Sequence, residues 1–253
     1  MAFRIGKYAP YGSQTNYGIE ISTPLAIPNC GLWFDFNDIS TLFQDTARTT
    51  PVTTNGQNIA GITDKSGSGN HVTTASTLKP TYNTGGVLGK CISFPTGNYS
   101  LATSYVPATG NNSRTICFLV TNIAGGGGTD ADFIGYGTNS SGQLYSLRRA
   151  GFGTKWNMAF NGTTQIGNVH SNIKNNVIIT RYNGVENQLY INGYQQVSTN
   201  VTLNTGSGNG ITIGTLVNTP IAFQCNEVVV YSRWLQDHEL NLLTTYTMRK
   251  WNI

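Results

Sequence analysis

Short runs of apolar residues, separated by turn-forming residues, recur along most of the chain. From Gly31 onward they include GLWFDF, CISFP, RTICFLVTNI, ADFIGYG, QLYSLRRA, NVIITRYNG, NQLYINGYQQV and FQCNEVVVYSR, with clusters of Gly, Asn, Ser and Pro between them. Runs of this length with such boundaries predict β-strands. The dipeptides Asn183-Gly184 and Asn192-Gly193 indicate hairpins, because both central residues of a type I′ turn need positive φ. The pattern predicts an all-β sandwich or jelly roll.

One segment, at the C-terminal end, has a helical period. Within LQDHELNLLTTYTMRKWNI the side chains near one helix face are Leu240, Leu243, Thr247 and Trp251. Acidic residues open the segment and basic residues close it, which is the polarity that the helix dipole favours. We therefore predict a short C-terminal helix.

Residues 1–29 show no sustained period. Their aromatic residues and prolines are scattered, which is typical of an extended segment without a core of its own. The rest of the chain is long enough to form one large all-β domain. The sequence thus predicts an extended N-terminal arm over 1–29 and one β-sandwich over 30–253.

The composition narrows the classes of function. Only 10% of the residues are charged, and the net charge of +4 is spread thinly along the chain, so we expect no nucleic-acid partner. No apolar run is long enough to span a bilayer, and the first residues lack the apolar stretch of a signal peptide. We therefore expect neither membrane insertion nor export by that route. The four cysteines lie in or beside apolar runs, which favours buried free thiols over disulfides or a metal site.

A longer series of motifs carries a resemblance. GLWFDFNDISTLFQDTARTTPVT is followed by ITDKSGSGNHVT, KPTY, CISFP, ITRYNGVENQLYINGYQQ and NEVVVYSRWLQDHELNLLTTYTMRKWNI. In this order the motifs resemble the concanavalin A-like lectin/glucanase superfamily, in its laminin-G-like branch, over roughly residues 31–253. The resemblance implies a jelly roll of two packed antiparallel sheets with a short C-terminal helix. The chain departs from it at Gln236, where the family often has a better helix cap such as Ser.

The resembled module occurs on bacteriophage virions, which implies the function we expect. That function is a non-enzymatic virion structural protein, a capsid-decoration, head-fibre or tail-associated protein that presents a glycan-binding or host-adhesion sandwich. The expected partners are other virion proteins such as the major capsid protein, host-surface glycans, and further copies of the chain as a homo-oligomer. The expected location is the virion surface, after synthesis in the host cytoplasm. A bacterial glycan-binding lectin or adhesin is the alternative, and a glycoside hydrolase is a third, disfavoured one.

The glutamates are the reason for disfavouring a hydrolase. Glucanases of the resembled superfamily present glutamates on one strand as E-x-D-x-E or E-x-D-x-x-E, because retaining hydrolysis needs two carboxyl groups about 5 Å apart. The glutamates of this chain are Glu20, Glu186, Glu227 and Glu239, and they are widely separated. We therefore expect no catalytic residues and no enzyme activity.

The stretch DKSGSGNH, residues 64–71, gathers an acid, a lysine, an amide and a histidine. In the resembled family it matches a structural turn, in which Asp64 can accept backbone N–H groups while Gly67 and Gly69 take positive φ. A calcium ion bound by Asp64 and carbonyl groups is the weaker alternative. We favour the turn.

Other acidic residues offer weaker metal sites. In GGGGTDAD, Asp130 and Asp132 have the alternate spacing of calcium ligands, although the tip of a hairpin is the favoured interpretation. In the run Asp237-His238-Glu239, the H-E-x-x-H pattern of a zinc helix fails, because Leu242 stands where the second histidine is required. We expect no cofactor, with calcium as the exception left open.

Aromatic and basic residues come together in YSLRRAGFGTKWNMAF. Rings can stack on sugars and guanidinium groups can bind hydroxyls or carboxylates. The candidate glycan-binding residues are Tyr145, Arg148, Arg149 and Trp156. The alternative, which we favour, is ordinary strand alternation with buried rings and solvated cations.

The N-terminal arm is the candidate anchor to an assembly. Apolar and aromatic side chains on an extended segment can dock on a partner, and basic side chains can meet an acidic surface. A disordered tail or an additional edge strand is the alternative. The candidate anchor residues are Phe3, Arg4, Ile5, Lys7, Tyr8, Tyr11 and Tyr17.

Overall fold

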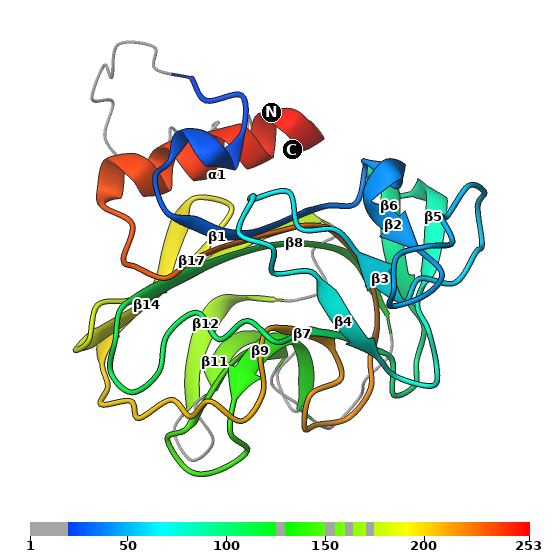
Figure 1. Ribbon diagram of the computed structural model, residues 1–253. Helices are drawn as coiled ribbons and strands as arrows, with labels where there is room; N and C mark the ends of the chain where they lie inside the picture. Colours follow the sequence, from blue (N-terminus) through cyan, green and yellow to red (C-terminus); the bar gives the residue numbers. More distant parts are fainter. Residues whose placement is uncertain (1–19, 125–129, 150–154, 160–163, 171–174) are drawn as a thin grey trace, which may run out of the picture.

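Two antiparallel β-sheets packed face to face make up most of the protein, and one helix covers the outer face of the larger sheet (Figure 1). The computed structural model describes residues 20–124, 130–149, 155–159, 164–170 and 175–253. The candidate anchor residues, from Phe3 to Tyr17, lie outside the described residues. The structure confirms the predicted all-β sandwich and its C-terminal helix, α1 (Asp237–Trp251).

The larger sheet has the strand order β15-β14-β13-β8-β17-β6-β5 among the described residues, and β1 pairs with β17 next to β6. Its strands are β1 (Cys30–Asp35), β5 (Thr81–Gly86), β6 (Gly89–Phe94), β8 (Arg114–Ala124), β13 (Asn175–Tyr182), β14 (Glu186–Ile191), β15 (Tyr194–Asn200) and β17 (Ala222–Tyr231).

The smaller sheet has the order β12-β11-β10-β9-β16-β7-β4. Its strands are β4 (Val72–Ala75), β7 (Ser100–Thr103), β9 (Ala131–Gly137), β10 (Leu144–Arg149), β11 (Lys155–Ala159), β12 (Thr164–His170) and β16 (Thr212–Gly214). The short elements are a ribbon of β2 (Leu42–Phe43) and β3 (Gly61–Ile62), and the 3₁₀ turns η1 (Pro24–Ala26) and η2 (Ile39–Thr41).

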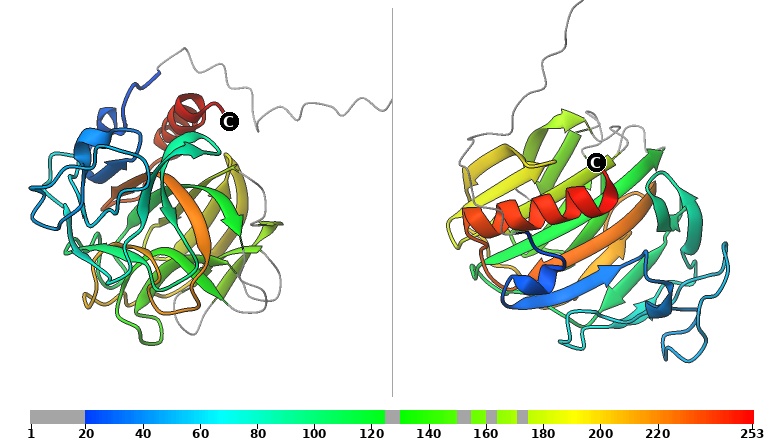
Figure 2. Two further views of the ribbon diagram at one scale, coloured as in Figure 1. Left: turned by 90° about the vertical axis from the view of Figure 1, so that its right-hand side faces the viewer. Right: turned by 90° about the horizontal axis from the view of Figure 1, so that it is seen from above.

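The centre of the larger sheet is buried on both faces, and β8 shows why. Its side chains alternate between two cores: Phe118 faces the smaller sheet, whereas Cys117 and Leu119 face α1. A strand covered on both sides needs a continuous apolar run, which is what RTICFLVTNI provides. Figure 2 shows α1 lying across the strands of this sheet.

The residue before the helix, Gln236, is held by a side chain from the first helical turn. The carboxylate of Glu239, three residues on, accepts the backbone N–H of Gln236 at 2.9 Å and also pairs with Arg233 at 2.7 Å. An acidic side chain at this position satisfies one of the free N–H groups of the first turn. The departure from the family pattern at Gln236 is therefore compensated by Glu239.

The last part of the predicted arm packs on the sandwich. Ile27 is buried in the core under α1, and the hydroxyl of Tyr231 donates to the carbonyl of Pro24 at 2.9 Å. Arg233 donates to the carbonyl of Pro28 at 3.1 Å. Residues 24–28 thus lie against the body of the protein just before β1.

Candidate functional site

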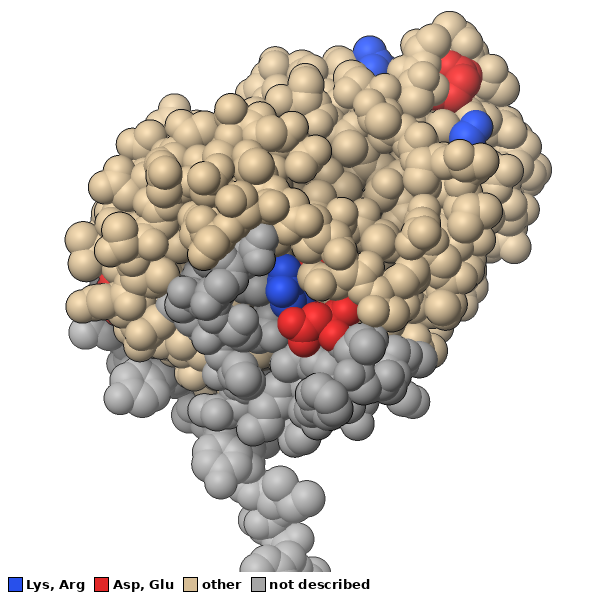
Figure 3. All heavy atoms as spheres, turned by 90° about the horizontal axis from the view of Figure 1, so that it is seen from below, with Lys and Arg blue, Asp and Glu red and all other residues tan. Residues whose placement is uncertain are grey.

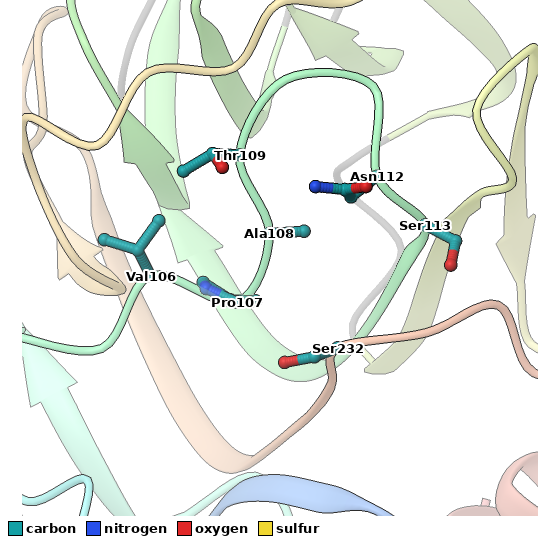
Figure 4. Close-up of a pocket in the computed structure, with 7 residues that line it drawn as sticks. All are labelled: Val106, Pro107, Ala108, Thr109, Asn112, Ser113 and Ser232. Atoms are coloured by element: carbon teal, nitrogen blue, oxygen red, sulfur yellow. The ribbon is translucent and has the colours of Figure 1, made fainter.

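A shallow pocket lies where the loop between β7 and β8 meets the residue that follows β17 (Figure 4). It has a volume of about 420 Å³. The described residues that line it are Val106, Pro107, Ala108, Thr109, Asn112, Ser113 and Ser232. They provide three hydroxyl groups, one amide and an apolar side, and none of them is charged.

A hydrogen bond joins the start of the pocket loop to Ser232. The hydroxyl groups of Tyr105 and Ser232 lie 2.5 Å apart. Tyr105 in turn packs on Gly31 of β1, where a Cβ atom would overlap the phenol ring. The glycine that opens GLWFDF therefore makes room for the tyrosine that supports this pocket.

A buried arginine lies behind the loop. Arg114, the first residue of β8, is fully buried and donates hydrogen bonds to the carbonyl groups of Gly110 and Asn112 at 2.9 and 2.6 Å. The loop that lines the pocket is thereby connected to the interior of the sandwich.

The predicted aromatic glycan-binding residues are inside the protein. Tyr145 and Trp156 are fully buried. The hydroxyl group of Tyr145 hydrogen-bonds to Thr180 and Asn187 at 2.7 and 2.8 Å, and the Trp156 ring packs 4.8 Å from that of Phe133. Neither ring can stack on a sugar from this position, because each already contacts the core.

The predicted cationic residues are also buried, so the expectation that they are solvated is wrong. Arg148 is 7% exposed, and it pairs with Asp132 at 3.2 Å and with Asp130 at 3.6 Å. Arg149 is 6% exposed and pairs across strands with Trp156, and burial lowers the pKa of its guanidinium group. The four candidates are therefore near neighbours, but they do not form an exposed patch.

The calcium candidate Asp132 has a different role. It lies inside β9, not at the tip of a hairpin, and it is 2% exposed. Its carboxylate accepts the backbone N–H groups of Val217 and Asn218, both at 3.0 Å. Asp132 therefore holds the loop after β16 while it pairs with Arg148. Figure 3 views the molecule from the side of the smaller sheet, and few of the described residues visible there are charged.

The DKSGSGNH stretch is a structural turn. The carboxylate of Asp64 accepts the backbone N–H groups of Trp33, Ser66 and Asn70 at 2.9, 2.9 and 3.0 Å. Gly67 and Gly69 have φ of 84° and 77°. The side chain of Asn70 donates to the carbonyl of Gly31 at 2.6 Å. The turn thus fastens the start of β1, as the favoured interpretation predicted.

A cluster of charged residues lies on the outer face of the larger sheet, beneath the C-terminal end of α1. Glu227 is 2% exposed and accepts hydrogen bonds from Trp33, Tyr246 and Lys250 at 2.8 Å and from Trp251 at 2.7 Å. These donors come from β1 and α1, so one carboxylate joins the helix to two neighbouring strands.

Asp35 extends this cluster. It faces Glu227 across β1 and β17, and Lys250 lies 3.0 Å from Asp35 and 2.8 Å from Glu227. Lys65 lies 3.2 Å from Asp35 and 2.7 Å from Asp38. A search of the sequence for the E-x-D-x-E motif cannot find this carboxylate pair, because Asp35 and Glu227 are distant in sequence and one of them is an aspartate. Both carboxylates are paired with lysine and lie under the helix.

The described residues contain no cluster of three or more side chains suited to a metal ion. No helix among them is long and apolar enough to cross a membrane. The four cysteines are free, as predicted, although Cys30 is only partly buried. Burial raises the pKa of the Cys30 and Cys91 thiols to about 12 and about 11, so these thiols are protonated and unreactive at neutral pH.

Comparison with known proteins shows the fold and no family. No protein-family model matches the chain, and no curated protein sequence matches it. A solved structure of an arabinofuranosidase complexed with arabinofuranosyl-α-1,2-xylobiose has a TM-score of 0.59 and 13% identity, and the match covers 75% of this chain and 50% of that one. A ligand-binding domain of botulinum neurotoxin serotype D, in complex with N-acetylneuraminic acid, has a TM-score of 0.58 and 11% identity, over 88% of this chain and 52% of that one.

A sialidase of Trypanosoma rangeli is similar at a TM-score of 0.54 and 12% identity, over 87% of this chain and 33% of that one. The chain thus spans about half the length of these solved structures, or less. At such identities the likeness shows the β-sandwich fold alone.

The expectation that the chain is not an enzyme is contradicted by these comparisons. The solved structures that share its fold include glycoside hydrolases, an arabinofuranosidase and a sialidase. The glutamate spacing excludes only the E-x-D-x-E arrangement of the glucanases, and the fold supports both hydrolases and binding domains.

The pocket was not predicted from the sequence. Its loop, SYVPATGNNS, has the composition of any surface connection, and Ser232 comes from a distant part of the chain. The available signal was Arg114, a charge directly before the apolar run TICFLV. A charged residue that begins a fully buried strand needs partners nearby, and here those partners belong to the pocket loop.

Proposed function

We propose that the protein binds carbohydrate in the pocket formed by residues 106–113 and Ser232. The chemistry of the lining carries this proposal. Hydroxyl and amide groups donate and accept hydrogen bonds, as the hydroxyl groups of a sugar require. Val106 adds a half-buried apolar side chain, whereas Pro107 and Ala108 are buried. The volume of about 420 Å³ is within the range of small-ligand sites.

The comparisons support a sugar as the ligand. Of the proteins that share the fold, one was solved with N-acetylneuraminic acid and another with an arabinofuranosyl xylobiose. A likeness of this kind supports a class of ligand and not a particular sugar, because unrelated functions share folds. The uncharged lining favours recognition through hydroxyl groups.

We further propose that the protein presents this pocket on a bacteriophage particle. The support is the resemblance of residues 31–253 to the laminin-G-like module, together with the low charge of the chain. The major capsid protein and host-surface glycans would be its partners, and the N-terminal residues its attachment. A bacterial lectin is the alternative. Electron microscopy of purified particles tests the setting: density for this chain on the virion supports it, and particles without the chain refute it.

Glycan-array screening followed by calorimetry tests the binding. Asn112→Ala and Ser232→Ala should each weaken binding about three- to tenfold, since each removes a hydrogen-bonding group. Asn241 is exposed on α1, and Asn241→Ala is the matched control that should bind normally. Unchanged affinity in the Asn112→Ala/Ser232→Ala double variant would place the sugar elsewhere.

A further inference from the structure

Arg114 is a buried cation whose hydrogen bonds all go to uncharged oxygens. Its Nε donates to the carbonyl of Asn112 at 3.0 Å, and Nη2 donates to the carbonyls of Gly110 and Asn112 at 2.9 and 2.6 Å. Nη1 donates to the hydroxyl groups of Tyr136 and Thr205 at 2.8 and 2.5 Å. Three of these five bonds are therefore made to the loop that lines the pocket.

The surroundings of Arg114 make this arrangement unusual. The side chain is 0% exposed, and the guanidinium group lies 5.1 Å from the ring centres of Tyr145 and Tyr182 and 5.9 Å from that of Tyr136. Burying a charge is unfavourable unless its hydrogen bonds are satisfied. Stacking on three rings supplies part of the compensation, and the loop carbonyls supply much of the remainder.

The fork shape of the guanidinium group fixes the loop in space. Two carbonyls, two residues apart, point at one rigid planar group, so the peptide planes around Asn111 have little freedom. Gly110 has φ of 58° and exchanges two backbone hydrogen bonds with Thr205, at 2.8 and 3.1 Å. Thr205 also binds Arg114. The guanidinium group thus binds both members of the Gly110–Thr205 backbone pair. A lysine cannot do this with its single ammonium group.

We infer that Arg114 is a positioning residue for the pocket: it holds residues 110–112 so that Thr109 and Asn112 present their side chains to a ligand in a fixed arrangement. The part of this inference that names a sugar as the ligand rests on the proposed function. The part that assigns Arg114 to the loop does not. A preformed loop raises affinity, because the loop loses little conformational entropy when the ligand binds.

Arg114→Lys and Arg181→Lys form a matched pair for the test. Arg181 is also buried, at 3%, and also makes several hydrogen bonds, to Gln188, Tyr190, Asp237 and the carbonyl of Leu235. Arg181 is on β13, where it pairs with Thr115, the residue that follows Arg114 on β8. Its side chain faces the helix side of the sheet, whereas that of Arg114 faces the space between the two sheets. Both variants keep a cation, and both lose the fork.

Two measurements separate a positioning role from general support. The first is hydrogen exchange of the Gly110 and Asn112 amides, which needs no ligand. In Arg114→Lys these amides should exchange at least about tenfold faster than in the wild type, while amides in the middle of β8 and β17 change little. In Arg181→Lys the Gly110 and Asn112 amides should keep their wild-type rates, even where the melting temperature falls by a similar amount.

The second measurement is affinity for two probes, N-acetylneuraminic acid and arabinofuranosyl-α-1,2-xylobiose. Arg114→Lys should weaken binding of a probe that the wild type binds by about tenfold, and Arg181→Lys should not. Wild-type protein that binds neither probe nor any array glycan would defeat the proposed function, while the exchange result would still decide the role of Arg114.

A second variant covers the case in which Arg114→Lys does not fold. Thr205→Val keeps Arg114 and removes the hydroxyl group that fixes Nη1, and it should give a smaller acceleration at the same two amides. Wild-type exchange rates at Gly110 and Asn112 in either folded variant, or an equal acceleration throughout the chain, would overturn the inference.

Discussion

Glu227 and Arg114 are buried charges on opposite faces of the larger sheet, and they are compensated in different ways. Glu227, under α1, is paired with Lys250 and receives three further hydrogen bonds from Trp33, Tyr246 and Trp251. Arg114, between the sheets, binds only uncharged oxygens. The ion pair of Glu227 joins a helix to two strands of the sheet. The hydrogen bonds of Arg114 to backbone carbonyls instead fix the conformation of one loop.

The largest effect is expected on the Glu227 side. Glu227→Ala should lower the free energy of unfolding by about 3–5 kcal/mol, because it leaves two indole N–H groups and the Tyr246 hydroxyl without their buried acceptor and leaves Lys250 with Asp35 alone. Urea denaturation measures the loss. Glu20→Ala is the control: Glu20 pairs with Arg249 on the exposed surface, so its loss should cost less than ~1 kcal/mol. Equal losses in the two variants would contradict the role assigned to Glu227.

Arg114→Met should have a smaller effect on stability, about 2–3 kcal/mol by urea denaturation. The variant leaves the carbonyl of Asn112 without its donor and the carbonyl of Gly110 with only the Thr205 N–H, but a surface loop can turn toward water and relieve part of the penalty. The tyrosine hydroxyl of Tyr136 cannot move as freely, because it is buried. A loss as large as that of Glu227→Ala would show that Arg114 supports the whole sandwich and not mainly the loop.

Asp64 is another buried charged residue, 5% exposed, and it resembles Arg114 in binding mostly backbone groups. Asp64→Ala should lower the free energy of unfolding by about 1–2 kcal/mol, visible as a fall of several degrees in melting temperature. Asp64→Asn, which keeps one acceptor oxygen, should lose less. A melting temperature that rises with calcium in the wild type and not in Asp64→Ala would instead support the calcium alternative.

The smallest effect is expected for the partly exposed pair of Glu239 and Arg233. The hydrogen bond from Arg233 holds the pKa of Glu239 below its ordinary value of 4.5. Because the pKa is lower in the folded state, the contribution of the pair is present above pH 4.5 and is lost as the pH falls through the folded value. Denaturation of wild type and Glu239→Gln, compared at about pH 7 and about pH 3.5, should show a difference of less than ~1 kcal/mol that shrinks at the lower pH. If the stability difference between wild type and Glu239→Gln grew as the pH fell, the pKa of Glu239 would be raised, not lowered, in the folded state.

The strands and the helix were predictable because their patterns are local. Leu240, Leu243 and Trp251 repeat at the helical spacing and are buried, as expected. Local chemistry identified the strands and the helix without any knowledge of the tertiary arrangement. The turn at Asp64 was predicted from the family resemblance, together with the glycines and the acid that such a turn uses.

The candidate sites were harder to predict because they depend on which face of a strand a residue occupies. In YSLRRAG the alternation was interpreted as placing the cations in solvent, but Arg148 pairs with Asp132 and Arg149 lies opposite the buried Trp156, so both are buried. The pocket depends on the contact of Tyr105 with Ser232, which no local pattern encodes. Long-range pairing, not composition, decides both outcomes.

The central position of β17 has a consequence for how the protein is made. This strand runs from Ala222 to Tyr231, close to the C-terminal end of the chain, yet it lies between β8 on one side and β1 and β6 on the other. During synthesis, β1 and β8 therefore emerge long before the strand that joins them. Contacts between such distant segments make folding slow, and the unpaired edges of β1 and β8 are open to aggregation until β17 arrives. A ribosome-bound chain that ends at residue 221 should remain sensitive to protease across the larger sheet, and addition of residues 222–253 should complete the sandwich in a single late step.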